Sequence, residues 1–148
     1  MLKFVNSEIR IRSSAKTILS CLLYLKHLKQ WWGVDSCFIE PKDGGLYALT
    51  WLRTFEGIKF ISTGRIKFYN PRTHLHLEDM IYINSEKPIL GPFTINFDVD
   101  ESSTYSILSI KQRGFQKGGV WDWYFQAVSD GWPQALVMLK TYVEKLES

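Results

Sequence analysis

The stretch between residues 36 and 112 constrains the fold most, because apolar and polar side chains alternate through much of it. The alternation is clearest at residues 93–99, where every second residue is apolar. A period of two predicts β-strands with one buried face. Turn signals such as Asp43-Gly44-Gly45 and Asn70-Pro71-Arg72 separate the segments. We therefore predict an antiparallel meander with strands at 36–40, 45–52, 58–69, 73–83, 93–99 and 104–113.

Helical spacing flanks this meander. Residues 2–11 predict a first strand, and Ser13 or Ser14 can cap a helix whose apolar residues within 15–23 share one face. Gly33 can end a second short helix. Residues 119–147 carry the longest helical stripe, formed by Trp121, Phe125, Val128, Trp132, Leu136, Leu139, Val143 and Leu146. Pro133 removes one amide donor from this segment, so we expect a kink or a broken turn there.

These elements predict an α+β layer fold, because the sheet has one dry face and only one long helix is available to cover it. A curved antiparallel sheet wrapped around the C-terminal helix is the economical solution, and it leaves room for a cavity. The chain has 148 residues, of which 15% are aromatic. Residues 1–148 are therefore expected to form one domain with a large core or a wide apolar pocket.

Composition excludes several classes of protein. The net charge is only +3, and the basic residues are scattered among acidic ones, so we expect no nucleic-acid partner. The longest apolar run, Cys21 to Leu25, is far shorter than the ~20 residues of a membrane span. Cys21 and Cys37 form no CxxC pair, and the N-terminus lacks a signal-peptide core, which favours a cytoplasmic protein.

Several short motifs occur in a fixed order along the chain. They are Trp31-Trp32-Gly33, Gly44-Gly45-Leu46-Tyr47, Gly64-Arg65-Ile66 followed by Pro71 and Leu75, Gln112-Arg113-Gly114-Phe115, and Gly131-Trp132 followed by Leu136, Leu139 and Tyr142. In this order they resemble the START, or Bet v 1-like, superfamily (SRPBCC), and within it the activator of heat-shock protein 90 ATPase homologue-like family. The resemblance implies a helix-grip fold with an internal apolar cavity. Members of the family include ligand binders, polyketide cyclase-like proteins and chaperone-binding domains.

The aromatic residues indicate where a ligand would bind. We expect the pocket wall to contain Trp32, Phe60, Phe68, Phe97, Trp121 and Phe125, with Tyr47, His76, Tyr82 and Gln112 as polar groups that orient the ligand. Ser62 and Gly64 leave space on the apolar face of their strand. The glycine-rich loop 114–119 is expected at the mouth. The alternative is that these aromatic residues simply fill the core.

The predicted function is the binding of a small hydrophobic molecule, lipid or polyketide-like, by a non-catalytic carrier or sensor. A co-chaperone-like module that binds heat-shock protein 90 is the first alternative, and a homodimer is left open. The second alternative is a cyclase or hydrolase that uses His76 and Glu78 in the same pocket. No catalytic residue or cofactor is assigned. His74 and His76 share a strand face, but two ligands are too few for a metal site.

Overall fold

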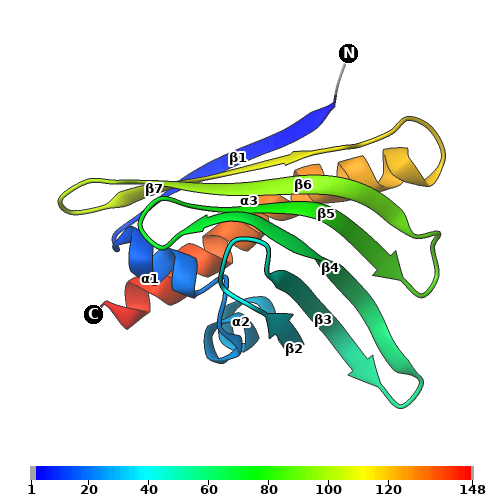
Figure 1. Ribbon diagram of the computed structural model, residues 1–148, viewed down its shortest axis with the longest axis horizontal. Helices are drawn as coiled ribbons and strands as arrows, with labels where there is room; N and C mark the ends of the chain where they lie inside the picture. The colour runs from blue at the N-terminus through cyan, green and yellow to red at the C-terminus, as the bar shows by residue number, and fades with distance from the viewer. Residues whose placement is uncertain (1–2, 148) are drawn as a thin grey trace.

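The computed structural model describes residues 3–147, except for the side chain of Arg53. Its elements follow the predicted order: β1 (Phe4–Ile11), α1 (Ala15–Ser20), α2 (Leu25–Trp32), β2 (Val34–Ile39), β3 (Leu46–Thr54), β4 (Gly57–Asn70), β5 (His74–Asn84), β6 (Leu90–Glu101), β7 (Ser106–Arg113) and α3 (Val120–Leu146). The strands form one antiparallel sheet in the order β1-β7-β6-β5-β4-β3-β2 (Figure 1). The predicted α+β class and meander are confirmed.

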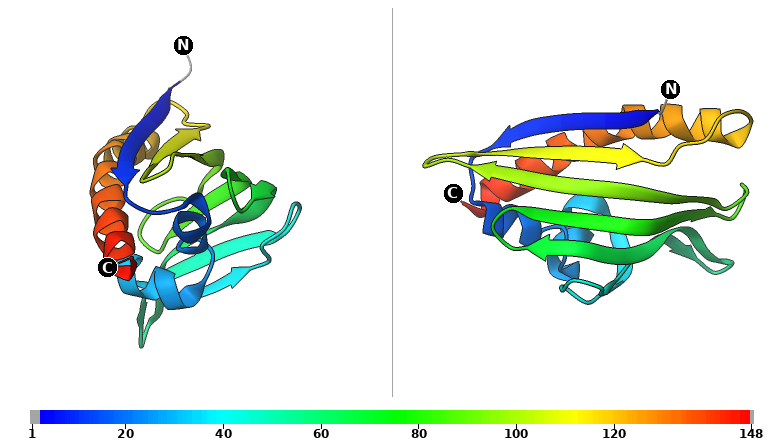
Figure 2. Two further views of the ribbon diagram at one scale, coloured as in Figure 1. Left: turned by 90° about the vertical axis from the view of Figure 1, so that its left-hand side faces the viewer. Right: turned by 45° about the horizontal axis from the view of Figure 1, so that its top comes forward.

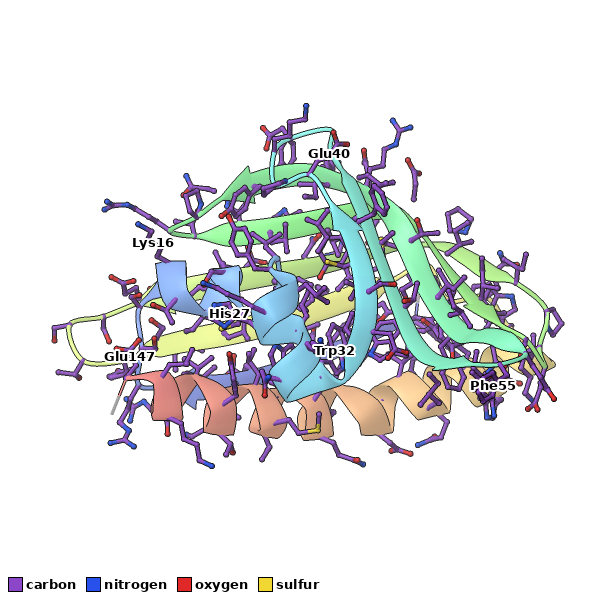
Figure 3. The ribbon with its side chains drawn as sticks, turned by 90° about the horizontal axis from the view of Figure 1, so that it is seen from below. Lys16, His27, Trp32, Glu40, Phe55 and Glu147 are labelled. Carbon is purple, nitrogen blue, oxygen red and sulfur yellow. The ribbon has the colours of Figure 1, made fainter. Side chains whose placement is uncertain are left out.

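The sheet curves around α3, and α1 and α2 close the space between them (Figure 2). Local sequence explains where the short helices begin and end. The Ser14 hydroxyl accepts a hydrogen bond from the Thr17 amide at the start of α1, and Gly33 ends α2 in the left-handed conformation. The α1–α2 corner places Trp32 between the sheet and the middle of α3 (Figure 3).

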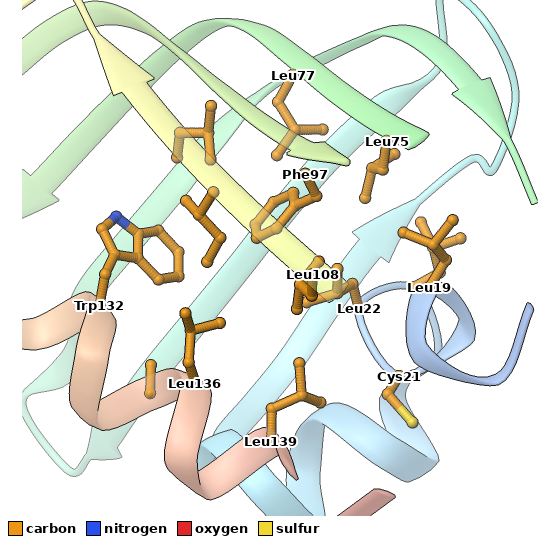
Figure 4. Close-up of a cluster of buried hydrophobic side chains, with 14 of the residues drawn as sticks. Leu19, Cys21, Leu22, Leu75, Leu77, Phe97, Leu108, Trp132, Leu136 and Leu139 are labelled. Atoms are coloured by element: carbon orange, nitrogen blue, oxygen red, sulfur yellow. The ribbon is translucent and has the colours of Figure 1, made fainter. Parts of the chain in front are cut away.

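The interior is solid at one end of α3. There, Leu136, Leu139 and Val143 are buried against the sheet and the α1–α2 corner. Phe97, Leu108, Leu22 and Leu19 belong to the same cluster, shown in close-up in Figure 4. Each large apolar side chain buried here contributes about 1.5–3 kcal/mol to stability. The hollow part of the interior lies beneath the other half of α3.

Helix α3 runs without a break from Val120 to Leu146, so the broken turn predicted at Pro133 is wrong. Proline removes one backbone hydrogen bond from a helix. In this 27-residue helix the neighbours of Pro133, Trp132 and Leu136, are both buried in the core. Their packing holds the chain helical through the position where one hydrogen bond is missing.

Candidate functional site

A cavity of about 490 Å³ lies between the sheet and the N-terminal half of α3. This volume is within the range of small-molecule sites. The cavity receives side chains from α2, from β3 to β7 and from α3. Its lining consists of Trp32, Leu49, Trp51, Phe60, Ser62, Leu77, Met80, Tyr82, Asn84, Ile95, Phe97, Gln112, Trp123, Tyr124, Ala127, Val128, Gly131, Trp132 and Ala135.

Aromatic rings form two groups on the wall. In the first, Trp32 lies with its ring centroid 5.2 Å from that of Trp51 and 5.8 Å from that of Trp132, which is also 5.8 Å from Phe97. In the second, Tyr82 stacks on Tyr124 at 5.2 Å. Ring pairs at these spacings stabilise one another, so the wall is built of mutually supporting flat surfaces.

The polar groups of the cavity form a chain of hydrogen bonds. The Trp132 indole Nε1–H donates to Gln112 Oε1 at 2.9 Å, and Gln112 Nε2 donates to the Tyr124 hydroxyl at 3.2 Å. Gln112 is only 1% exposed, yet both ends of its amide are satisfied. Burial raises the pKa of Tyr124, so its hydroxyl stays protonated. The chain gives an otherwise apolar wall one polar position.

The cavity is uncharged, because no Asp, Glu, Lys, Arg or His is among its lining residues. Binding of a ligand to this apolar wall gains about 25 cal/mol for each Å² of apolar surface that is removed from water. An isolated buried charge, in contrast, is strongly disfavoured. Across residues 3–147, no cluster of three or more His, Cys, Asp or Glu could hold a metal ion. The site is therefore suited to holding a neutral molecule.

The structure brings five of the ten predicted ligand residues together on this wall: Trp32, Phe60, Tyr82, Phe97 and Gln112. Ser62 also lines the cavity, as expected from its small side chain. The space expected beside Gly64 is different, because a side chain there would collide with Met80 of β5. Methionine from the neighbouring strand thus occupies the volume that this glycine leaves open.

Three other predicted ligand residues lie at the side of the cavity rather than on its wall. The Tyr47 hydroxyl donates to the Leu22 carbonyl at 2.7 Å and secures the α1–α2 corner to β3. Phe125 packs edge-on against Phe115 at 5.1 Å, beside the β7–α3 loop. The rings of Trp121 and Tyr124 meet edge to face, with centroids 6.1 Å apart, and Trp121 is not among the lining residues. Both α3 residues support the wall from outside.

Phe68 and His76 lie on the outer face of the sheet, so the structure does not bring them to the cavity. The strict alternation expected in β4 fails because the pairing with β5 shifts register between Ile66 and Phe68. Ile66 is fully buried, whereas Phe68 is 47% exposed. On β5, His76 lies between the buried residues Leu75 and Leu77 and therefore faces outward.

The outer-face histidine has its own partners. His76 Nε2 lies 2.8 Å from Asp98 Oδ1, and its ring centroid is 4.8 Å from that of His74. Glu78 follows two residues later on the same strand, before Asp79 with its positive φ of 54° begins an irregular stretch. A general acid or base built from His76 and Glu78 would thus work on the opposite side of the sheet from the cavity.

Sequence reasoning missed several wall residues, although signals for them exist. Trp51 alternates with Leu49 on β3 and pairs with Phe60 on β4. On α3, Tyr124 lies four residues before Val128 and eight before Trp132, so it shares their face. The predicted stripe includes Val128 and Trp132, which line the cavity, but at its N-terminal end Tyr124 lines the cavity in place of Trp121 and Phe125.

Fold and cavity together define the class of protein. Seven antiparallel strands that wrap a C-terminal helix over an apolar cavity constitute the helix-grip fold of the Bet v 1-like (START, SRPBCC) superfamily. Within this superfamily, the sequence model of the activator of Hsp90 ATPase homolog 1-like proteins matches residues 13–144. The chain belongs to this family, as its motifs predicted.

Solved structures with the same fold share little sequence with the chain. A protein from Mesorhizobium loti is 15% identical, with a TM-score of 0.76 over 97% of this chain and 98% of its own. The Aha1 dimer from Colwellia psychrerythraea is 15% identical, with a TM-score of 0.72 over 97% of both chains. The AHSA1 protein from Silicibacter pomeroyi is 15% identical, with a TM-score of 0.71 over 99% of this chain and 100% of its own. These likenesses confirm the fold.

Two further searches give negative results. A search of curated proteins gives no significant match to the sequence. Among residues 3–147, no helix has both the length and the apolar character needed to cross a membrane.

Proposed function

We propose that the protein binds a small hydrophobic molecule in the cavity between the sheet and α3. The observation that carries this proposal is a pocket of about 490 Å³, open to solvent on one side, whose wall is mostly apolar and contains no charged residue. Pockets of this volume with a mostly apolar lining are typical small-molecule sites. An apolar guest would remove this wall from water, which favours binding.

The division of the interior supports the proposal. Leu136, Leu139 and Val143 pack closely at the other end of α3, outside the cavity lining. We place the protein in the cytoplasm, because Cys21 and Cys37 are both free thiols. The role is that of a carrier or sensor, because the residues that line the cavity include no charged acid or base for turnover.

The experiment fills the cavity from one strand. Ser62 faces the cavity from β4, so Ser62→Phe inserts a ring into the void. Thr63→Phe is the matched control, since the next residue on the strand points to the opposite face. Nile red, a neutral dye that fluoresces in apolar surroundings, is titrated into each variant, and native mass spectrometry of freshly purified protein looks for a bound molecule.

We expect Nile red to bind the wild-type protein and Thr63→Phe, and to bind Ser62→Phe at least tenfold more weakly. Equal binding by all three proteins would show that the dye does not use the cavity. No binding to the wild-type protein, together with no co-purified molecule, would refute the proposed function.

A second candidate is a co-chaperone-like role, and the family's description as activators of Hsp90 ATPase favours it. Its test is direct: association with heat-shock protein 90 and a change in that chaperone's ATPase rate at micromolar concentrations. Trp31 is buried, and it stacks on Trp32 with ring centroids 4.8 Å apart. This tryptophan pair is therefore part of the core rather than a docking surface, and a chaperone would have to contact other residues.

A further inference from the structure

We propose that the natural ligand is an uncharged, ring-containing molecule with a carbonyl or ether oxygen, and that this oxygen accepts a hydrogen bond from the Tyr124 hydroxyl. The inference rests on the proposed function and adds the chemical class of the guest. It is carried by the direction of the hydrogen bonds in the cavity wall, which the side chains themselves fix.

The direction is set by Trp132. An indole N–H can only donate, so the Gln112 atom that it contacts at 2.9 Å must be the amide oxygen. The amide nitrogen of Gln112 therefore faces Tyr124, and it can only donate. The Tyr124 oxygen accepts this bond at 3.2 Å, so its own proton must be directed elsewhere.

The Tyr124 proton has no protein acceptor in the described part of the chain, where Gln112 is the one recorded hydrogen-bond partner of this hydroxyl. Tyr124 is itself part of the cavity lining, so the free donor belongs to the binding site. Leaving a buried donor unmatched is unfavourable. A ligand oxygen placed against Tyr124 satisfies it, whereas a pure hydrocarbon does not.

Tyr82 adds a second hydroxyl on the same wall. Its ring stacks on that of Tyr124, and burial raises its pKa while the neighbouring Asn84 side chain acts in the opposite direction. The Asn84 oxygen already accepts the Glu86 backbone amide, which leaves the nitrogen of Asn84 to face Tyr82. Tyr82 therefore offers a second hydroxyl beside Tyr124, while the hydrogen bond from Gln112 fixes the direction of the Tyr124 hydroxyl alone.

Charge and shape narrow the class further. A carboxylate or amine held within this cavity would find no charged residue in its lining, although Lys59 and Lys87 lie over the outer rings Phe60 and Trp123. The cost of an unpaired buried charge is several times that of a lost hydrogen bond. Eight of the nineteen lining residues are aromatic. Flat rings can stack on or meet the edges of such side chains, so a rigid ring system gains more than a flexible chain, which must also lose rotational freedom.

The test uses three tricyclic probes of nearly equal size: 9-fluorenone, a neutral ketone; fluorene, which lacks the oxygen; and 9-fluorenecarboxylate, an anion. Their affinities are measured by displacement of Nile red from the wild-type protein, from Tyr124→Phe, and from Tyr24→Phe. The last is a matched control, since Tyr24 is 46% exposed and is not among the lining residues. For each protein we take the ratio of its affinity for fluorenone to its affinity for fluorene. The different solubilities of the two probes cancel when this ratio is compared between proteins.

We expect this ratio to fall about 2- to 12-fold in Tyr124→Phe, the equivalent of about 0.5–1.5 kcal/mol for one hydrogen bond, and to stay constant in Tyr24→Phe. The carboxylate should bind at least tenfold more weakly than the ketone. A second measurement needs no variant, so it remains valid if Tyr124→Phe does not fold. The infrared carbonyl stretching band of fluorenone bound to the wild-type protein should lie at lower frequency than that of fluorenone in an alkane, because a hydrogen bond weakens the carbonyl bond.

The outcomes separate the two proposals. An unchanged ratio in a folded Tyr124→Phe, or an alkane-like carbonyl band, overturns the hydrogen bond while leaving the cavity as a binding site. Equal binding of carboxylate and ketone overturns the uncharged class. Binding of Nile red but of no tricycle shows that the ring class is wrong, and failure of Nile red as well removes the proposed function itself.

Discussion

The Tyr47 hydroxyl offers a sharp test of how the α1–α2 corner is held to the sheet. Tyr47 is 2% exposed, and its hydroxyl donates to the Leu22 carbonyl at 2.7 Å. Tyr47→Phe keeps the ring and removes only the oxygen. The lost donor leaves a buried carbonyl unmatched, which costs about 1–3 kcal/mol. For a chain of this size, a loss of about 2 kcal/mol corresponds to a decrease in Tm of roughly 4–8 °C.

Urea denaturation followed by tryptophan fluorescence measures this change. We expect the midpoint to fall while the m-value stays constant, because the surface exposed on unfolding is unaltered. Tyr24→Phe, at an exposed tyrosine, should change stability by less than about 0.5 kcal/mol. Equal stabilities for Tyr47→Phe and wild type would refute the assigned hydrogen bond. Weaker Nile red binding at unchanged stability would instead return Tyr47 to the ligand site.

Three further predictions concern alkaline pH, the thiols and α3. Burial raises the pKa values of Tyr47 and Tyr124 above their ordinary value near 10, so their contribution to stability is complete below pH 10 and is lost as the pH rises further; a fall in the urea midpoint above pH 10 that persisted undiminished in Tyr47→Phe would contradict this. Cys21 is fully buried and its pKa is raised to about 12, so Ellman's reagent should titrate Cys37 first in the native protein and both thiols in urea; rapid reaction of both in the native state would be inconsistent with the packing. Gly131 lies within α3 with open space where a Cβ would be, so Gly131→Ala should stabilise the protein by about 0.5–1 kcal/mol in the same urea assay, and a loss of stability would show that the space is needed.

The sequence predicts the strands well because one repeating rule governs them. Buried and less buried residues alternate along β6 and β7, and turn residues such as Gly44 and Pro71 separate the predicted strands. The family motifs then specify how the strands and α3 are arranged, which periodicity alone leaves open. The architecture could therefore be stated before any coordinates.

The site is only half predictable, and the reasons are local. The register shift after Ile66 turns Phe68 outward, and no residue type there signals it. Tyr47 looks like a polar wall residue, but its partner is a backbone carbonyl, which has no sequence signature. The Gln112–Tyr124–Trp132 chain joins β7 to α3, so its geometry depends on how the helix is rotated over the sheet. The alternation of apolar and polar residues predicts which face of the sheet a residue occupies. Its contacts with α3 depend on how the helix packs on the sheet, which the alternation does not specify.

The interior is filled unevenly: one end of α3 is closely packed against the sheet, and the other end borders the cavity. The end around Leu139 is closely packed, whereas side chains that face the cavity border open space on one side. Mutations such as a smaller ring or a displaced hydroxyl would alter which guest is accepted while the framework remains intact. Such a framework can be adapted to new molecules by a few substitutions in the hollow half, which makes it well suited to evolutionary diversification.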